Sequence, residues 1–172
     1  TGLMILTIDD AGTEDRDDAL SVELVDGGTR IGVHIADAGT LIPIGGAIDI
    51  EADRRMATLY VPDGKVDMLP VGVAKGVGSM DPDQSRCALS MFVIVDASGE
   101  TSDLEVVPSV VRSAEALTYE DADRAMGGYG GPWASALAQL QRAGDTLRAR
   151  REAAGAINIE QSEMVVAVSD TG

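Results

Sequence analysis

Short apolar runs separated by tight turns are the feature that most constrains the fold of this chain. Residues 19–25 and 30–36 are rich in Val, Ile and Leu, and they flank the segment Asp26-Gly27-Gly28-Thr29. Glycine adopts positive φ without steric penalty, so this segment predicts a β-hairpin. A second turn, Asp96-Ala97-Ser98-Gly99, lies between strand-like runs at 87–95 and 104–111. Consecutive hairpins predict a sheet that is largely antiparallel.

Helical patterns alternate with these strands. Apolar residues recur at helical spacing over 47–59. Thr118 is a good N-cap, with Asp121 at the third helical position, and predicts a helix through Met126. Pro132 is expected to open a longer helix that ends near Gly155. Residues 3–8 and 157–168 predict further strands, and 64–83 an irregular loop. The sequence therefore predicts one α+β domain, with a mixed, largely antiparallel sheet and a few helices.

The composition limits the kind of protein this can be. The 172 residues are 45% apolar, which is enough for a core and excludes a disordered acidic tail. The 29 acidic and 13 basic side chains give a net charge of −16, which should repel RNA or DNA unless metal ions or another part of the protein add positive charge. There is no apolar stretch of about 20 residues, so no membrane span or membrane partner is expected. Cys87 is the single cysteine, and with no apparent signal peptide this favours the cytoplasm.

The segment 9–18 holds six acidic residues and one arginine, between two apolar runs. Carboxylates gathered this closely repel one another, and a hard cation such as Mg²⁺ or Mn²⁺ relieves that repulsion. A solvated surface loop is the alternative interpretation. The position at a strand end favours the metal site, as does the turn at Gly12, which could fold the loop back so that Asp9 faces residues 15–18.

Two other acidic motifs do not fit this segment. An EF-hand loop that began at Asp15 would have Ala19 at its fifth position and Leu20 at its sixth, where an oxygen ligand and a glycine are needed. A phosphatase of the haloacid dehalogenase type needs a second aspartate two residues after the first. Ala11 occupies that position after Asp9.

The pattern Asp9-x₅-Asp15-x-Asp17-Asp18-Ala19-Leu20 resembles the catalytic signature of the RNB family, the exoribonucleases of the ribonuclease II and ribonuclease R type. Further blocks resemble the family in the right order along the chain. They are Ile31-Gly32-Val33-His34-Ile35-Ala36-Asp37, Leu59-Tyr60-Val61-Pro62-Asp63 with Met68-Leu69-Pro70, Ser79-Met80-Asp81-Pro82 with Arg86-Cys87-Ala88-Leu89-Ser90, and Arg112-Ser113-Ala114-Glu115-Ala116-Leu117-Thr118-Tyr119-Glu120.

The resemblance implies a partial RNB-type catalytic domain, with residues 1–172 as its N-terminal portion. It implies hydrolysis of single-stranded RNA from the 3′ end, with release of nucleoside 5′-monophosphates. The missing half of the domain and flanking RNA-binding domains are then expected partners. By itself the chain is expected to be inactive or feeble. An alternative is a catalytically silent RNB-like module that binds RNA or a protein partner, but the intact aspartate quartet favours the enzyme.

The resemblance also assigns roles to residues. It makes Asp9, Asp15, Asp17 and Asp18 catalytic and metal-binding, with Mg²⁺ as the expected ion and Mn²⁺ as a possible one. Tyr60 is expected to stack on a base near the 3′ end, and Tyr119 to lie near the terminal sugar. The alternative for both tyrosines is a half-buried core position. Asp10 and Glu14 fall outside the family spacing and are expected to face solvent.

The remaining notable residues favour structural roles. His34 is the only histidine, and a structural imidazole within the sheet is expected there. Trp133 is expected in the core, and Cys87 has no neighbouring histidine or asparagine in the sequence to activate it. The resemblance places an arginine-rich motif in the later half of the family's domain. Arg148, Arg150 and Arg151 are instead expected at the solvated end of a helix, where positive charge is favourable.

Overall fold

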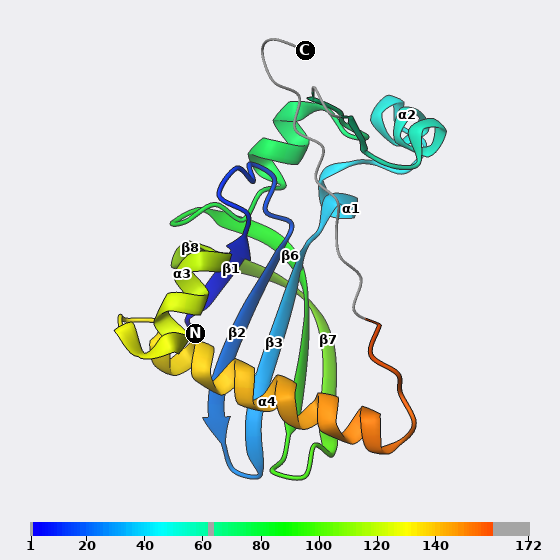
Figure 1. Cartoon of the computed structure of the whole chain (residues 1–172). Helices are drawn as coiled ribbons and strands as arrows, with labels where there is room; N and C mark the ends of the chain where they lie inside the picture. The colour runs from blue at the N-terminus through cyan, green and yellow to red at the C-terminus, as the bar shows by residue number, and fades with distance from the viewer. Residues whose placement is uncertain (1, 62–63, 160–172) are drawn as a thin grey trace.

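The computed structural model describes residues 2–61 and 64–159. Its body is a six-stranded sheet with the order β7-β6-β3-β2-β1-β8 (Figure 1). The strands are β1 (Ile5–Asp9), β2 (Asp18–Val25), β3 (Gly28–Ala36), β6 (Ser85–Val95), β7 (Thr101–Arg112) and β8 (Glu115–Thr118). All neighbouring pairs are antiparallel except β1 and β8, which run parallel. The expected α+β fold with a largely antiparallel sheet is confirmed.

The β2–β3 hairpin has the turn that the sequence predicts. Val25 pairs with Gly28, and Gly27 has a φ of 95°, which glycine adopts readily. A Cβ on Gly28 would lie 2.2 Å from the carbonyl oxygen of Val95, so this position also needs glycine because β6 passes close by. From this turn the β2–β3 pairing extends to Asp18, which pairs with Ile35, and so positions the strand that follows the acidic segment.

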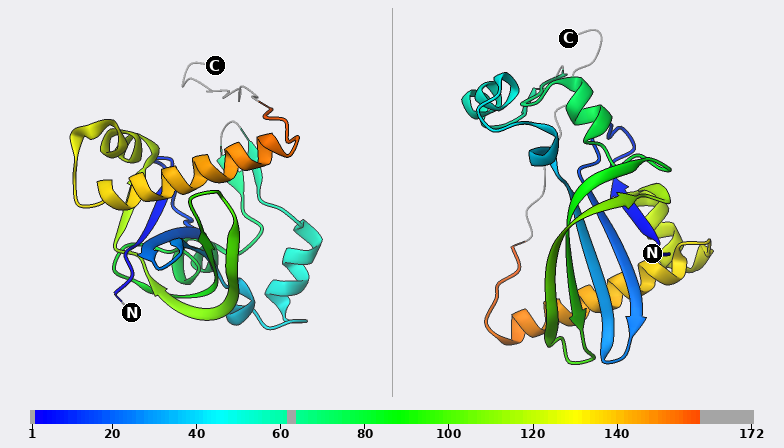
Figure 2. Two further views of the ribbon diagram at one scale, coloured as in Figure 1. Left: turned by 90° about the horizontal axis from the view of Figure 1, so that it is seen from below. Right: turned by 180° about the vertical axis from the view of Figure 1, so that it is seen from behind.

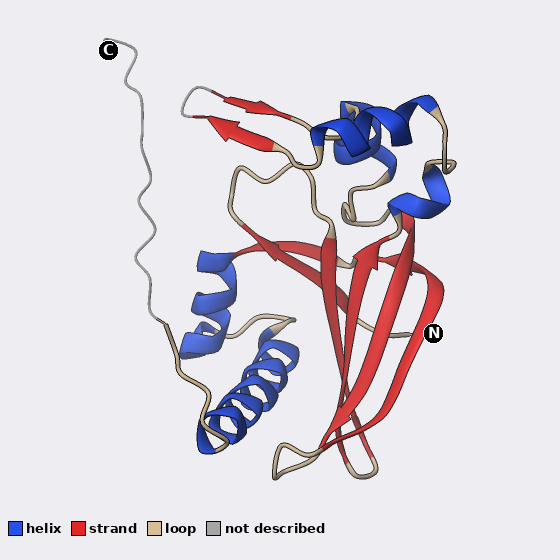
Figure 3. Ribbon diagram, turned by 90° about the vertical axis from the view of Figure 1, so that its right-hand side faces the viewer, coloured by secondary structure: helices blue, strands red, loops and turns tan. Residues whose placement is uncertain are grey.

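The helices form two groups. Helix α4 (Ala134–Ala153) crosses one face of the curved sheet and contacts β2 and β3 (Figures 1 and 2). The second group lies at one end of the sheet with the small β4–β5 sheet (Figure 3). The elements at that end are α1 (Ala38–Leu41), α2 (Ala47–Arg55), β4 (Leu59–Val61), β5 (Gly64–Val66) and the π-helix η1 (Gly72–Val77).

Two apolar clusters hold β1 in place. Ile5 belongs to one cluster and the next residue, Leu6, to the other, because successive side chains of a strand point to opposite faces. Trp133, which was expected in the core, is partly buried and packs against the Leu6 cluster from its edge. Since β1 is buried on both sides, the position of Asp9 at its end is well fixed.

The predicted helix at 118–126 is present with its cap. The Thr118 hydroxyl accepts a hydrogen bond from the Asp121 backbone N–H, and the Asp121 carboxylate accepts one from the Thr118 N–H. This capping box begins α3 (Tyr119–Arg124), which continues as the π-helix η2 (Ala125–Tyr129).

Some predicted boundaries were wrong. The helix expected over 47–59 ends at Arg55, because Met56 adopts a left-handed conformation with a φ of 61°, and Leu59 begins β4. The segment 64–83, expected to be an irregular loop, contains β5 and η1. Residues 157–159 have no regular structure, and the rest of the strand region predicted at 157–168 lies outside the described residues. Within the described ranges, no helix has the length and apolar character needed to cross a membrane.

The single histidine is buried inside the sheet, as expected. His34 is 1% exposed, and its two ring nitrogens lie 2.7 Å from Ser90 Oγ and 2.9 Å from Ser21 Oγ. Ser90 in turn bonds to Ser109 over 2.6 Å, so the polar network extends across β2, β3, β6 and β7. A Cβ on Gly32 would lie 2.3 Å from Ser21 Oγ, so glycine makes room for this network.

Candidate functional site

The acidic segment is the connection between β1 and β2. β1 ends at Asp9 and β2 begins at Asp18, and these two strands are antiparallel neighbours. The Asp17 carbonyl accepts a hydrogen bond of 2.8 Å from the Ala36 N–H, which ties the end of the loop to β3. The strand pairing therefore brings the two ends of the acidic segment to the same edge of the sheet.

Asp9 and Asp18 have raised pKa values. Burial is the main cause for Asp9, followed by the negative charge of Asp18. Burial is also the main cause for Asp18, followed by the charge of Asp17. Within the described residues, the buried Oδ2 of Asp9 accepts no hydrogen bond. A buried carboxylate oxygen that lacks a donor and is repelled by neighbouring acids is suited to bind a cation.

Asp15 points to a different partner. Its Oδ2 lies 2.8 Å from Nζ of Lys65, which is also 3.3 Å from Oδ1 of Asp67. In the described part of the chain, no three acidic, histidine or cysteine side chains are grouped so that they could hold a metal ion. The negative charges of Asp9, Asp17 and Asp18 therefore act on one another. Asp15 instead forms an ion pair with Lys65.

Ion pairs attach the acidic loop to the surrounding segments. Glu14 pairs with Lys75, and Arg16 pairs with Asp81 over 2.9 Å. Of the two acids expected to face solvent, Asp10 is exposed, and Glu14 is exposed but paired. The lysine partners lie 50 and 61 residues away from their acids, so no local sequence pattern reveals them.

A cleft of about 980 Å³ opens beside the acidic loop. Tyr60 and Lys65 line it together with Asp9, Asp15 and Asp17. Tyr60 is 71% exposed as a residue. Tyr60 and Lys65 are direct partners across the β4–β5 pair, and Lys65 Nζ lies 6.0 Å from the centroid of the Tyr60 ring. An exposed aromatic ring next to carboxylates offers a stacking surface within reach of the acids.

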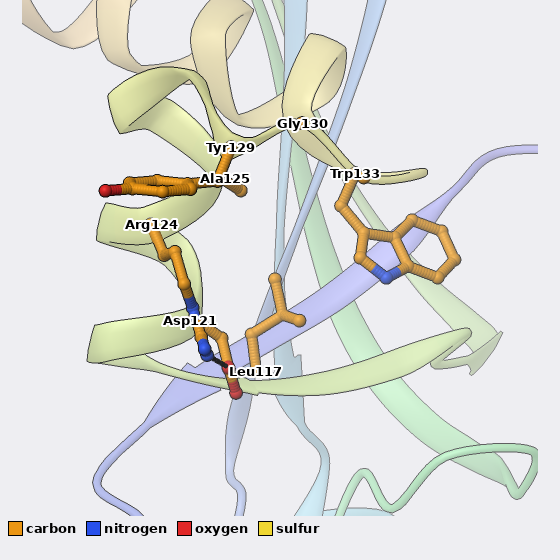
Figure 4. A pocket seen from close by; sticks show the side chains of 8 residues that line it. Leu117, Asp121, Arg124, Ala125, Tyr129, Gly130 and Trp133 are labelled. Atoms are coloured by element: carbon orange, nitrogen blue, oxygen red, sulfur yellow. Dashed lines mark hydrogen bonds and ion pairs between the residues drawn. The ribbon is translucent and has the colours of Figure 1, made fainter.

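Tyr119 lies near the same edge but is not a lining residue of this cleft. It is 55% exposed and follows Thr118, which is the parallel pairing partner of Asp9. A smaller hollow of about 310 Å³ lies beside α3 and is lined by Asp121, Arg124, Tyr129 and Trp133, among others (Figure 4). Asp121 there pairs with Arg124 and caps α3, so its carboxylate has a structural role.

Residues 1–172 match the family model of the RNB domain. The chain belongs to the RNB family. An uncharacterized ribonuclease of Synechocystis sp. is 38% identical, over 98% of this chain and 25% of the relative. The chain therefore spans about a quarter of the length of that curated relative.

Solved structures show the same fold. Mycoplasma genitalium RNase R, determined in complex with ribose-methylated single-stranded RNA, superposes with a TM-score of 0.92 at 23% identity, over 99% of this chain and 27% of that one. Yeast Ssd1, described as a pseudonuclease, superposes with a TM-score of 0.76 at 24% identity, over 87% of this chain and 18% of that one. The fold is thus found both in RNase R and in a pseudonuclease.

Proposed function

We propose that this RNB domain is the acidic part of the active site of a 3′-to-5′ exoribonuclease that hydrolyses single-stranded RNA to nucleoside 5′-monophosphates. The carrying observation is Asp9, which is held at the end of a doubly buried strand with a buried oxygen that accepts no hydrogen bond from the described residues. The repulsion between Asp9 and Asp18 supports the same assignment, since it disfavours leaving both carboxylates charged without a cation.

The residues that we propose to hold the divalent ion are Asp9, Asp15, Asp17 and Asp18. When bound, Mg²⁺ or Mn²⁺ supplies charge neutralisation at the scissile phosphate and lowers the pKa of a bound water. The rigid end of β1 fixes Asp9 before the ion arrives. The connection at Ala36 N–H to Asp17 fixes the other end of the loop, so little reorganisation is needed there.

The tyrosines are proposed to position the RNA. Tyr60 exposes its ring to the cleft and can stack on a base close to the carboxylates. Tyr119 follows the pairing partner of Asp9 and is proposed to lie near the terminal sugar, where contact with the 2′-hydroxyl would select RNA over DNA.

The charge of the chain makes further partners necessary. At −16, this part of the enzyme repels an RNA backbone. We propose that the remaining half of the catalytic domain and flanking RNA-binding domains supply the positive charge, as the RNB resemblance implies. We propose that the enzyme acts in the cytoplasm, in keeping with the single cysteine of these 172 residues.

A catalytically silent module that binds RNA or a protein partner is the second candidate. It is favoured by the absence, in the part of the chain that the structure describes, of a complete group of three metal donors. The similarity to the pseudonuclease Ssd1 points the same way. The presence of all four aspartates in the sequence favours the enzyme, because a module without the chemistry has no need of the complete set.

Replacing Asp17 by Asn discriminates between the two candidates. In the full polypeptide that carries this chain, Asp17→Asn should reduce degradation of a 5′-labelled single-stranded RNA by at least about a hundredfold, because one charged group of the ion site is lost. Binding of the RNA should stay within about twofold of wild type, since an uncharged amide adds no repulsion to the phosphates. Mononucleotide release is measured by mass spectrometry, and binding by fluorescence anisotropy.

Asp10→Asn is the matched control, because Asp10 is exposed, lies in the same loop and falls outside the family spacing. It removes the same charge and should leave degradation within about twofold of wild type. Wild-type protein that binds RNA without releasing nucleotides would instead establish the silent module.

A further inference from the structure

The chain has only two lysines, and both pair with the acidic loop. Lys65 in β5 contacts Asp15, and Lys75 in η1 contacts Glu14, the residue before Asp15. Both lysines are largely covered, with side-chain exposures of 21% and 26%. Two similar lysine–carboxylate ion pairs thus hold the loop, one through Asp15 and the other through Glu14.

Only one of these pairs involves an acid of the proposed ion site. Asp15 is a member of the quartet, and Glu14 is not. The Lys65–Asp15 pair is also the less exposed one, since the Asp15 side chain is 29% exposed and that of Glu14 is 66% exposed. Electrostatic attraction is screened less where water is excluded, so solvent screens the Lys65–Asp15 contact less than the Lys75–Glu14 contact.

We propose that Lys65 is a built-in counter-cation that competes with the divalent ion for Asp15 and thereby sets the affinity of the site. This inference rests on the proposed function, since it takes Asp15 as a ligand. In the ion-free chain the Lys65 ammonium neutralises Asp15 and keeps it away from Asp9, Asp17 and Asp18. When the divalent ion binds, Asp15 exchanges the singly charged Lys65 ammonium for the doubly charged ion as its partner.

Asp67 makes this exchange easier. Its Oδ1 already lies 3.3 Å from the Nζ of Lys65, so the lysine faces two carboxylates at once. An ammonium that leaves Asp15 can therefore move closer to Asp67 and keep a charged partner. Release of Lys65 into solvent, which would leave Asp67 alone in its 14% exposed position, is not required.

The first test compares Mn²⁺ binding to the full polypeptide and its variants by electron paramagnetic resonance of the free ion. Lys65→Met should tighten Mn²⁺ binding by about five- to tenfold, because the competing charge is gone while the alkyl chain remains. Lys65→Arg keeps the charge and should stay within about twofold of wild type. Lys75→Met is the matched control and should also stay within about twofold, because Glu14 is not in the ion site.

A second measurement uses the wild-type protein and needs no variant to fold. Amine acylation is followed by mass spectrometry of the peptides that contain Lys65 and Lys75. Saturation with Mn²⁺ should change the acylation rate of Lys65 by at least about threefold, because its ion pair with Asp15 is broken, while Lys75 serves as the internal reference.

The outcomes separate this inference from the proposed function. Mn²⁺ that binds to the wild type but not to Asp17→Asn supports the proposed site. If Mn²⁺ then binds Lys65→Met no tighter than wild type, or leaves the acylation of Lys65 unchanged, the competition is refuted while the site stands. Equal tightening in Lys65→Met and Lys75→Met would show general charge screening and refute the specific role of Lys65. A wild type that binds no Mn²⁺ would overturn both.

Discussion

Individual residues in this domain combine a structural and an electrostatic role, and His34 illustrates this most clearly. Both of its ring nitrogens have serine partners inside the sheet, and its neighbour Phe92 packs edge-on at 5.6 Å between ring centroids. Burial is the main reason that the pKa of His34 is lowered, and the positive charge of Arg30 adds to the effect. The imidazole is therefore neutral in the folded protein at neutral pH.

This lowered pKa predicts a stability that depends on pH. The unfolded chain binds the proton with the ordinary pKa of 6.5, and folded His34 binds it only at lower pH. Between these two pKa values the unfolded state carries more protons than the folded state. The contribution of His34 to the free energy of unfolding is therefore fully present above about pH 6.5 and is lost as the pH falls below it. The slope of this contribution is at most about 1.4 kcal/mol per pH unit. Urea unfolding between neutral and mildly acidic pH measures it.

The control for this prediction is His34→Gln. This variant should be less stable at every pH, because the serine network loses its imidazole, but it should lack the His34 part of the pH slope. The difference between wild type and variant removes the contributions of Asp9 and Asp18, whose raised pKa values act in the opposite direction. A difference that is constant with pH would contradict a lowered pKa.

At the scale of secondary-structure elements, local chemistry defined the beginnings of elements better than their ends or their partners. The Thr118 cap and the Gly27-Gly28 turn were predicted correctly, because each depends on a few adjacent residues. The parallel pairing of Leu6 with Glu115 joins segments more than 100 residues apart, which no local pattern encodes. The sequence and its family resemblance singled out the aspartates. The contact of Asp15 with Lys65 depends on how β5 packs and could not be predicted.

The cap at Thr118 links an element to the site. Thr118→Ala should lower the free energy of unfolding by about 1 kcal/mol, because the Asp121 N–H at the start of α3 loses its acceptor. Urea denaturation measures this change. Thr101→Ala, at the exposed start of β7, is the control and should change stability by less than about 0.5 kcal/mol. Equal effects of the two substitutions would argue against the cap.

At the scale of the whole molecule, the negative charge includes several acidic side chains that line the cleft. The net charge of −16 destabilises any compact state through self-repulsion, and six acidic residues are gathered within residues 9–18. Three consecutive loop residues, Glu14, Asp15 and Arg16, each form an ion pair with a different segment. These pairs offset part of the repulsion within the loop, and the Lys65–Asp15 pair also lines the cleft.

This distribution predicts that salts stabilise the protein in two distinguishable ways. Sodium chloride should raise the stability of wild type and Asp17→Asn alike, because it screens repulsion over the whole surface. Magnesium chloride at matched ionic strength should add a further increment in the wild type, about 2.7 kcal/mol when the ion is at 100 times its dissociation constant, because it binds the folded state. Thermal unfolding measures both effects, and excess chelator should remove only the second.

Since Asp17→Asn lacks one charge of the proposed site, it should lose most of the magnesium increment and keep the sodium effect. An equal response of both proteins to magnesium would mean that the ion acts only by screening, and that the carboxylates at the end of β1 do not bind it.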